Sequence, residues 1–367
     1  MTVILSEAKD LLSRASWADR DNRSFGAARL RMTSLVIQTS FLGDMVLTTP
    51  LIAHLARSAP VDVLATPAAA ALLANNPHVR EAIGYDKRGA DRGARGFLRL
   101  ARTLRSRGYT QAYLAQGSVR SGALAAASSI PERIGFSRSA GRRFYTVRVP
   151  YIENTHHSAR LLALATRDPA REVPATALRP HLYPGAAERT AVDDVLGAYG
   201  PEPLVAMAPG SVWATKRWPY FAELASALRD VARIVVVGAE ADRALAEQII
   251  GASKGQAVDA TGRLSLLGSA DLIGRAALLV TNDSAPLHLA SAMNTPTIAV
   301  FGPTVPEFGF GPLADSSTVV GHKALACRPC DRHGPQKCPL GHWRCMREIS
   351  PEQVAALARS LITRGSD

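Results

Sequence analysis

The chain has 367 residues and a mass of 39.0 kDa, more than one small hydrophobic core usually organises, so two domains are expected. Apolar residues make up 47% of it and charged residues 20%, which is typical of a globular protein, and no apolar run approaches the ~18 residues that span a bilayer. The four cysteines all follow residue 326 and do not resemble a secreted disulfide framework, and no signal peptide is recognisable. These features favour a cytoplasmic protein.

The net charge of +12 is concentrated in one part of the chain. Between Lys87 and Arg148 there are 14 basic residues and two acidic ones, Asp91 and Glu132. Thirteen of the 14 are arginine, which binds carboxylates and phosphates through paired hydrogen bonds. This imbalance indicates a partner with several negative charges, such as a lipid surface, a nucleic acid or a charged glycan. A solubilising surface is the alternative, although such surfaces usually mix both signs.

The first half of the chain alternates between strand and helix patterns. Residues 1–31 have no sustained apolar period, so we expect a poorly ordered leader, with the folded protein starting near Met32. Short apolar runs then predict strands, and the segments between them predict helices. The expected strands are 34–38, 61–65, 82–85, 111–114, 133–136 and 144–149, and the expected helices are one ending near 57 and others at 68–74, 93–107 and 157–165.

The helix expected at 93–107 carries arginines along one side. Arg92, Arg95, Arg99 and Arg102 are spaced three or four residues apart, which places them in one stripe, with the apolar residues largely opposite. A basic amphipathic helix of this kind often lies on an anionic membrane surface, and a solvated outer face is the alternative.

The second half repeats the alternation after a proline-rich passage at 168–184, which we interpret as a linker. The expected strands are 204–208, 234–238, a short one ending near 260, 277–280 and 297–301, and the expected helices are 219–230, 241–250, 265–276 and one ending near 293. Repeated strand–helix units imply parallel sheets. The expected fold is therefore α/β, with an N-terminal domain at 32–180, a C-terminal domain at 181–367 that ends in a helix, and a cleft between them.

Ligands bind such sheets at the carboxyl ends of the strands. This rule places Asp44 and the segments 209–216, 238–240 and 282–288 around one opening. Neither a G-x-G-x-x-G fingerprint nor a P-loop is present, so helix N-termini and single cations would have to bind any phosphate.

Two segments of the C-terminal half fit an anion site. Asp283 and Ser284 precede a helix that contains His288, so all three lie near a helix N-terminus, and simple helix capping is the alternative. Lys216 follows a glycine-bearing loop, where it can neutralise a leaving diphosphate, and a solvent-facing lysine is the alternative.

Several phrases, in order from about Met32 to the C-terminus, resemble glycosyltransferase family 9, the ADP-heptose:lipopolysaccharide heptosyltransferases. They are residues 40–50 (SFLGDMVLTTP), 209–211 (PGS) with 216–219 (KRWP), 238–240 (GAE), 261–265 (TGRLS), 281–284 (TNDS) with His288, 302–304 (GPT) and the cysteine run at 327–346. KRWP and the cysteines are most similar to the heptosyltransferase II branch of the family.

The resemblance implies a GT-B fold of two Rossmann-like domains and an inverting transfer of L-glycero-D-manno-heptose from ADP-heptose to the lipopolysaccharide inner core, with no cofactor required. It implies that Asp44 is the general base and that Lys216 is the diphosphate cation. The further donor contacts implied are Ser211, Glu240, Asp283, Ser284 and His288. The chain departs from the family pattern at Ala285-Pro286, where glycine and a larger apolar residue are expected.

The implied acceptor, heptosyl-Kdo-lipid A, is anionic and lies at the cytoplasmic face of the inner membrane. Arg120, Arg133, Arg142 and Arg143 are therefore acceptor candidates, each with a plain surface residue as the alternative. The enzyme is expected to be cytoplasmic and peripheral to that membrane, with an anionic membrane surface among its partners and no nucleic acid.

The cysteines are arranged as Cys327-x2-Cys330-x7-Cys338-x6-Cys345. The first pair has zinc-ligand spacing, but the later gaps are irregular. The family resemblance accounts for the cysteines without a metal, so no metal site is expected.

Two alternatives stay open. One is another sugar-nucleotide enzyme of the same architecture, such as an epimerase. The other is a zinc-containing nucleic-acid-binding protein, which the basic stretch and the Cys-x2-Cys pair favour, although the arginines lack interleaved aromatic residues.

Overall fold

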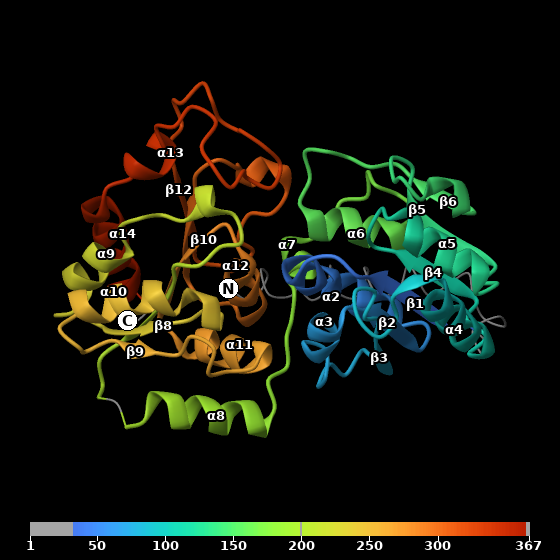
Figure 1. The fold of residues 1–367 in the computed structure, drawn as a ribbon, viewed down its shortest axis with the longest axis horizontal. Helices are drawn as coiled ribbons and strands as arrows, with labels where there is room; N and C mark the ends of the chain where they lie inside the picture. The colour runs from blue at the N-terminus through green and yellow to red at the C-terminus, as the bar shows by residue number, and fades with distance from the viewer. Residues whose placement is uncertain (1–31, 199, 365–367) are drawn as a thin grey trace, which may run out of the picture.

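The computed structural model describes residues 32–198 and 200–364, so the expected leader at 1–31 lies outside the described residues. Two lobes lie side by side in Figure 1, the N-terminal lobe in blue to green and the C-terminal lobe in yellow to red. Each is built on a six-stranded parallel sheet, which confirms the expected α/β class. The boundary at residue 180 stays a prediction.

The N-terminal sheet has the strand order β3-β2-β1-β4-β5-β6. Its strands are β1 (Ser34–Gln38), β2 (Val61–Ala65), β3 (Glu81–Gly84), β4 (Gln111–Leu114), β5 (Glu132–Phe136) and β6 (Val147–Val149). Its helices are α2 (Leu42–Ala56), α3 (Pro67–Ala71), α4 (Gly93–Ser106), α5 (Val119–Ala127), α6 (His157–Thr166) and the short α7 (Ala175–Leu178). β1 lies at the centre of the sheet, and every residue of its SLVIQ sequence is buried, as expected of a parallel strand covered on both faces.

The C-terminal sheet has the strand order β12-β11-β10-β7-β8-β9. Its strands are β7 (Leu204–Ala208), β8 (Arg233–Val236), β9 (Val258–Asp259), β10 (Leu278–Asn282), β11 (Thr297–Phe301) and β12 (Ser317–Gly321). Its helices are α8 (Ala186–Leu196), α9 (Phe221–Leu228), α10 (Arg243–Ala252), α11 (Leu266–Arg275), α12 (Ala285–Met293), the short α13 (Arg344–Arg347) and the C-terminal α14 (Pro351–Arg364).

The two lobes pack directly on each other through α2 and α12, near the centre of Figure 1. A Cβ atom at Gly43 would lie 2.6 Å from Cδ2 of His288, so only glycine permits this approach. Val46 and Leu72 of the N-terminal lobe share a buried apolar cluster with C-terminal residues such as Leu289. Burial of this apolar surface stabilises the arrangement of the lobes.

The N-terminus of α6 also contacts the C-terminal lobe. The backbone N–H of His157 donates to the carbonyl of Gly309 at 2.8 Å, and Nη2 of the buried Arg160 donates to the carbonyl of Phe308 at 2.9 Å. Within the described ranges, no helix is both long and apolar enough to cross a membrane.

Candidate active site

A cavity of about 710 Å³ lies between the lobes, within the range typical of small-ligand sites. It opens at the carboxyl ends of strands from both sheets, as expected for doubly wound folds. The lining residues with functional side chains are Ser40, Asp44, Gln116, Arg138, Tyr151, His157, Ser211, Lys216, Asp283, Ser284, His288, Arg332 and His333. The sequence therefore correctly grouped Asp44 with residues 209–216 and 282–288.

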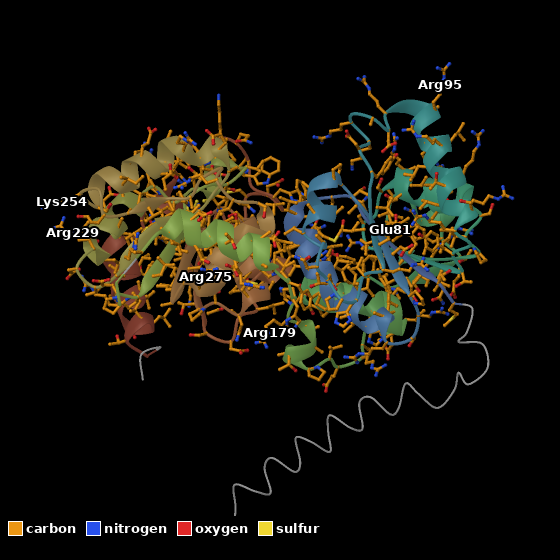
Figure 2. All side chains as sticks on the ribbon, turned by 90° about the horizontal axis from the view of Figure 1, so that it is seen from below. Glu81, Arg95, Arg179, Arg229, Lys254 and Arg275 are labelled. Carbon is orange, nitrogen blue, oxygen red and sulfur yellow. The ribbon has the colours of Figure 1, made fainter. Side chains whose placement is uncertain are left out.

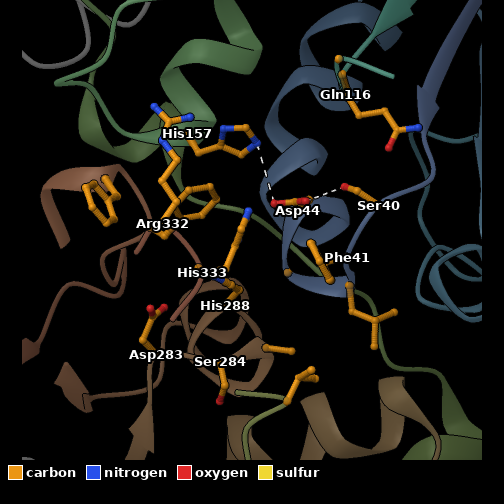
Figure 3. Close-up of a pocket in the computed structure, with 18 of the residues that line it drawn as sticks. Ser40, Phe41, Asp44, Gln116, His157, Asp283, Ser284, His288, Arg332 and His333 are labelled. Atoms are coloured by element: carbon orange, nitrogen blue, oxygen red, sulfur yellow. Dashed lines mark hydrogen bonds and ion pairs between the residues drawn. The ribbon is translucent and has the colours of Figure 1, made fainter. Parts of the chain in front are cut away.

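Asp44 lies in the first turn of α2 and faces the cavity from the N-terminal lobe (Figure 3). Its Oδ2 accepts a hydrogen bond of 2.5 Å from Ser40 Oγ, and Ser40 Oγ lies 2.6 Å from Gln38 Oε1. Burial raises the pKa of Asp44 above its ordinary value of 3.8, although the Ser40 hydrogen bond and the nearby His288 oppose the shift. A carboxylate with a raised pKa is a stronger base, so Asp44 can accept a proton within this cavity.

Two histidines beside Asp44 are neutral. Nε2 of His157 lies 4.0 Å from Oδ1 of Asp44, but burial lowers the pKa of His157 to about 3, so the two form no ion pair at neutral pH. Burial likewise lowers the pKa of His288 to about 4. Nδ1 of each ring has no hydrogen-bond partner among the described residues. Buried polar atoms usually have a partner, so these two nitrogen atoms are exceptions beside the cavity.

The opposite wall holds a buried ion pair. Nζ of Lys216 lies 2.6 Å from Oδ2 of Asp283, and Thr304 Oγ1 donates to the same oxygen at 2.7 Å. Lys216 and Asp283 are both more than 90% buried. An ammonium group has three N–H donors, so Lys216 can hold Asp283 and still donate into the cavity.

Asn282 fixes the loop that carries Lys216 to the end of β10. Its side-chain Nδ2 donates to the carbonyl of Pro209 at 2.8 Å, and its Oδ1 accepts from the backbone N–H of Trp218 at 3.0 Å. The loop between these two residues includes Ser211 and Lys216, so both donor candidates are held against the same strand end.

The N-terminus of α12 opens into this wall. Ser284 is the N-cap residue and Pro286 lies in the first turn, but the Ser284 side chain makes no capping hydrogen bond. Ser284 and Ala285 both line the cavity. A helix N-terminus thus faces the cavity, although the chain has Ala285-Pro286 where the family pattern has other residues. This N-terminus favours binding of an anion.

Glu240 lies outside this cavity. It is exposed and pairs with Arg243 at 2.9 Å, three residues further along the chain. Its carboxylate lies over Gly262, where an added Cβ would come within 2.3 Å of Oε2. Glu240 is therefore at the carboxyl end of the same sheet, beside the segment 261–265, and its role as a donor contact stays a prediction.

None of the four arginines expected to bind the acceptor lines the cavity. Arg120 Nε donates to the Tyr85 hydroxyl at 2.5 Å, and Arg133 Nε donates to the carbonyl of Phe144 at 2.6 Å. Both guanidinium groups are thus engaged in internal contacts. Arg142 and Arg143 are exposed. An acceptor role for these four stays a prediction.

The cavity contains arginines that the sequence reasoning did not select. Arg138 follows β5, and Arg332 lies in the long segment after β12, together with His333. The His333 ring stacks on Trp213 at 6.2 Å and lies 5.9 Å from the ring of Phe41, in the other lobe. Arg138 belongs to the basic stretch at 87–148 but was not chosen as an acceptor candidate, whereas no local pattern places Arg332 at the cleft.

Hydrogen bonds to the loop at 212–216 hold the segment that carries Arg332. The hydroxyl of Thr215 donates to the carbonyl of Pro335, and Gln336 Nε2 donates to the carbonyl of Val212 at 2.9 Å. Gly334, at φ +87°, lies against the Lys216 side chain, where a Cβ would come within 3.2 Å of it. The segment therefore covers Lys216.

The four cysteines lie in this same part of the fold and are free thiols. Burial, reinforced by the neighbouring Cys330 thiol, raises the pKa of Cys345 to about 11. In contrast, the pKa of Cys338 is lowered. Burial would raise it, but hydrogen bonds from backbone N–H groups, the strongest from Trp343, have the larger combined effect. No group of three or more potential ligands is arranged to hold a metal ion in the described residues. The absence of a metal site stays a prediction.

Two doubly wound lobes that face each other across a cleft form a GT-B fold. The family model described as "Glycosyltransferase family 9 (heptosyltransferase)" matches residues 97–342. The chain therefore belongs to glycosyltransferase family 9. This assignment confirms the resemblance in the sequence and selects a glycosyltransferase over an epimerase.

Relatives and solved structures agree with the assignment. The chain is 28% identical to lipooligosaccharide heptosyltransferase 2 of Haemophilus influenzae, over 91% of this chain and 100% of the relative. It is 29% identical to lipopolysaccharide heptosyltransferase 2 of Escherichia coli K12, over 90% and 99%. The structure of E. coli ADP-heptose LPS heptosyltransferase II matches with a TM-score of 0.75 and 26% identity, over 92% and 100%. The family 9 structure from Veillonella parvula, at 23% identity, has the same fold with a TM-score of 0.79, over 91% and 98%.

Proposed function

We propose that this protein transfers L-glycero-D-manno-heptose from ADP-heptose to the heptosyl-Kdo-lipid A inner core of lipopolysaccharide, with inversion at the anomeric carbon and with no cofactor. The names of its relatives support the donor and the acceptor class. The observation that carries the proposal is the position of Asp44 across one cavity from Lys216 and the N-terminus of α12. An inverting transfer needs one base and one leaving-group site on opposite sides of the sugar.

Asp44 is the proposed general base. The acceptor hydroxyl oxygen forms a bond to the anomeric carbon of the heptose, and its proton passes to the Asp44 carboxylate. Ser40 holds Oδ2 of that carboxylate, which leaves Oδ1, on the side of His157, to receive the proton.

The leaving group is ADP. The bond from the anomeric carbon to the diphosphate oxygen breaks, and its electron pair stays on that oxygen. Lys216, held by Asp283, and the N-terminus of α12 at Ser284 stabilise the developing charge. Ser211 and His288 complete the proposed contacts to the sugar donor. His288 is neutral, and its Nδ1 has no partner among the described residues. Glu240 is proposed to contact the adenosine at the outer end of the donor.

Mass-spectrometric analysis of the purified protein with ADP-heptose and truncated lipopolysaccharide tests this function. We expect one heptose to be added to the acceptor and ADP to be released in equal amount, with inverted anomeric configuration by NMR. Transfer from UDP-sugars alone, or epimerisation of the donor without transfer, would contradict the proposal.

We further propose that the enzyme works in the cytoplasm at the anionic face of the inner membrane, through α4. Arg95, Arg99 and Arg102 are exposed on one side of this helix, and Leu98, 48% exposed, lies among them. Figure 2 shows Arg95 projecting from the outer end of its lobe, away from the C-terminal lobe. An exposed leucine within a basic stripe suits a surface that is both anionic and apolar below its headgroups.

Replacing Arg95, Arg99 and Arg102 together with glutamine is expected to weaken binding to anionic vesicles roughly 100-fold, since each basic residue near such a surface contributes about 1 kcal/mol. Vesicle co-sedimentation at low salt, where screening is weakest, measures this. The donor KM should not change.

Glutamine at Arg229 and Lys254 is the control, because both are exposed at the far end of the other lobe (Figure 2). Equal loss of vesicle binding in the control would point to net charge alone. Unchanged binding in the α4 variant would contradict a role of α4 at the membrane.

A further inference from the structure

Two arginines from opposite lobes meet at one carboxylate on the rim of the cavity. Arg138, two residues beyond the end of β5, contacts Oε1 of Glu153 through Nη1. Nη2 of Arg332, from the segment that covers Lys216, lies 3.6 Å from the same oxygen. Both arginines line the cavity, so this Arg138–Glu153–Arg332 bridge joins the lobes beside the proposed site of transfer.

The bridge carries more positive than negative charge. Arg138, and more weakly Arg332 and Arg160, lower the pKa of Glu153, so this single carboxylate is ionised among three guanidinium groups. Arg160 also donates from Nη2 to the backbone carbonyl of Glu153 at 2.5 Å, which fixes the position of the segment. One carboxylate cannot neutralise three cations, and the excess charge favours a second anion at this place.

The two arginines that line the cavity keep donors free for such an anion. Their side chains are 59% and 66% exposed, and each guanidinium has five N–H groups, of which Glu153 engages few. An exposed ion pair of this kind contributes little to stability. An incoming carboxylate or phosphate that binds a guanidinium through two hydrogen bonds can therefore compete for it.

Aromatic rings hold Arg138 at the rim. Its guanidinium lies 5.8 Å from the centre of the Tyr151 ring, and Phe136 packs edge-on against that ring at 5.2 Å. Arg160 Nη1 donates to the Tyr151 hydroxyl at 2.6 Å. Packing against these aromatic side chains thus holds Arg138 in place. Arg332 is held in place by the hydrogen bonds of its segment to residues 212–216.

We propose that Arg138 and Arg332 form a clamp, one side from each lobe, for an anionic group of the acceptor sugar, with Glu153 as the internal anion that spaces the two arginines. The inference rests on the proposed function and names the site that would recognise the charged part of its acceptor. The ligand chemistry is a carboxylate or a phosphate on the sugar that receives the transfer. An anion bound at the clamp would contact both lobes, because the two arginines belong to different lobes.

Single substitutions Arg138→Ala and Arg332→Ala test the clamp in the full chain. Each is expected to weaken acceptor binding roughly 10- to 100-fold, as for the loss of a charge-assisted hydrogen-bonded pair. Arg332→Lys, which keeps the charge but loses the paired geometry, should fall between wild type and Arg332→Ala. Arg229→Ala is the control, an exposed arginine of the same lobe far from the cavity. Acceptor affinity is measured by equilibrium binding and, separately, as KM.

Modified acceptors identify the anion. An acceptor with its carboxyl groups reduced to alcohols and another with its phosphates removed are compared with the intact acceptor. We expect one of the two modified acceptors to bind the wild-type protein as weakly as the intact acceptor binds the Arg138→Ala variant. The same modified acceptor should bind the Arg138→Ala variant and the wild-type protein with equal affinity. Equal affinity of all three acceptors for wild type would overturn the proposal.

The donor separates the remaining outcomes. ADP affinity should be unchanged in both alanine variants, and a parallel loss would overturn the clamp by assigning the arginines to the donor diphosphate. The clamp would also be overturned if the wild-type protein transfers heptose and the folded Arg138→Ala and Arg332→Ala variants bind the acceptor with normal affinity. In contrast, a wild-type protein that binds the acceptor through these arginines but transfers no heptose would support the clamp and contradict the proposed function.

Discussion

Replacing Asp44 with asparagine is expected to lower kcat roughly 10²–10⁴-fold, the range usual for loss of a general base. Asparagine keeps the shape of the side chain and removes only its ability to accept the proton. The affinity for ADP should stay nearly the same, because Asp44 belongs to the wall opposite Lys216. Steady-state kinetics with saturating acceptor, together with ADP titration, measure both quantities.

Stability distinguishes a base from a structural carboxylate. The N-cap of α2 is Phe41 and Asp44 lies in the first turn, so asparagine costs the helix little. Burial disfavours the charged form of Asp44, as its raised pKa shows, so Tm should not fall in the asparagine variant. A variant with normal Tm and near-normal kcat would contradict the proposed mechanism.

The pH profile gives a second check. The base must be ionised, so kcat/KM should fall as the pH drops through the pKa of Asp44, which burial places above the ordinary 3.8. Ser40 donates to Asp44 and lowers that pKa, so Ser40→Ala should move the acidic limb to higher pH and leave the rate on the plateau largely intact. A limb that does not move would show that another group titrates.

Replacing Lys216 with alanine is expected to lower kcat roughly 10²–10³-fold, as is usual when one preorganised donor to a developing charge is removed. Donor affinity should fall as well, since in the proposed role the ammonium group binds the diphosphate in both the ground state and the transition state. Asp283 then loses its charged partner in a buried site and keeps only the hydrogen bond from Thr304, which costs roughly 3–5 kcal/mol of stability. Kinetics, ADP titration and thermal unfolding measure the three effects.

A double substitution separates catalysis from stability. Lys216→Ala with Asp283→Asn removes both charges, so no buried carboxylate is left unpaired, and Tm should recover most of its loss. The rate should stay low, because the cation for the diphosphate is still absent. Recovery of the rate together with Tm would mean that Lys216 serves only to neutralise Asp283.

Strands buried on both faces were predictable from the sequence with their observed ends, as 34–38, 204–208 and 297–301 illustrate. Continuous burial requires continuous apolar residues, and that pattern is local. β12 was not predicted because it is an edge strand with one buried residue, Val320. α5 was missed because its small residues give no clear apolar period.

Some residues of the candidate site were likewise predictable from local sequence, and others were not. Asp44 and Lys216 follow strands and belong to recognisable phrases, so local sequence placed them. Arg332 reaches the cleft because hydrogen bonds such as those of Thr215 and Gln336 hold its segment against residues more than a hundred positions earlier in the chain. Conversely, Arg120 belongs to the basic stretch, yet its guanidinium lies between the rings of Tyr85 and Phe97. Charge composition gives the number of cations and says nothing of where each one points.

The contact of Gly43 with His288 sets a dimension of the reaction. Asp44 follows Gly43 directly, and His288 belongs to the helix whose N-terminus faces the cavity. The contact between the Gly43 backbone and the His288 ring therefore separates the proposed base from the proposed site of the leaving group. The separation of the two walls at this point is therefore set by the main chain of α2 and the His288 ring. We expect substitutions elsewhere on either wall to change which sugars fit without changing this separation.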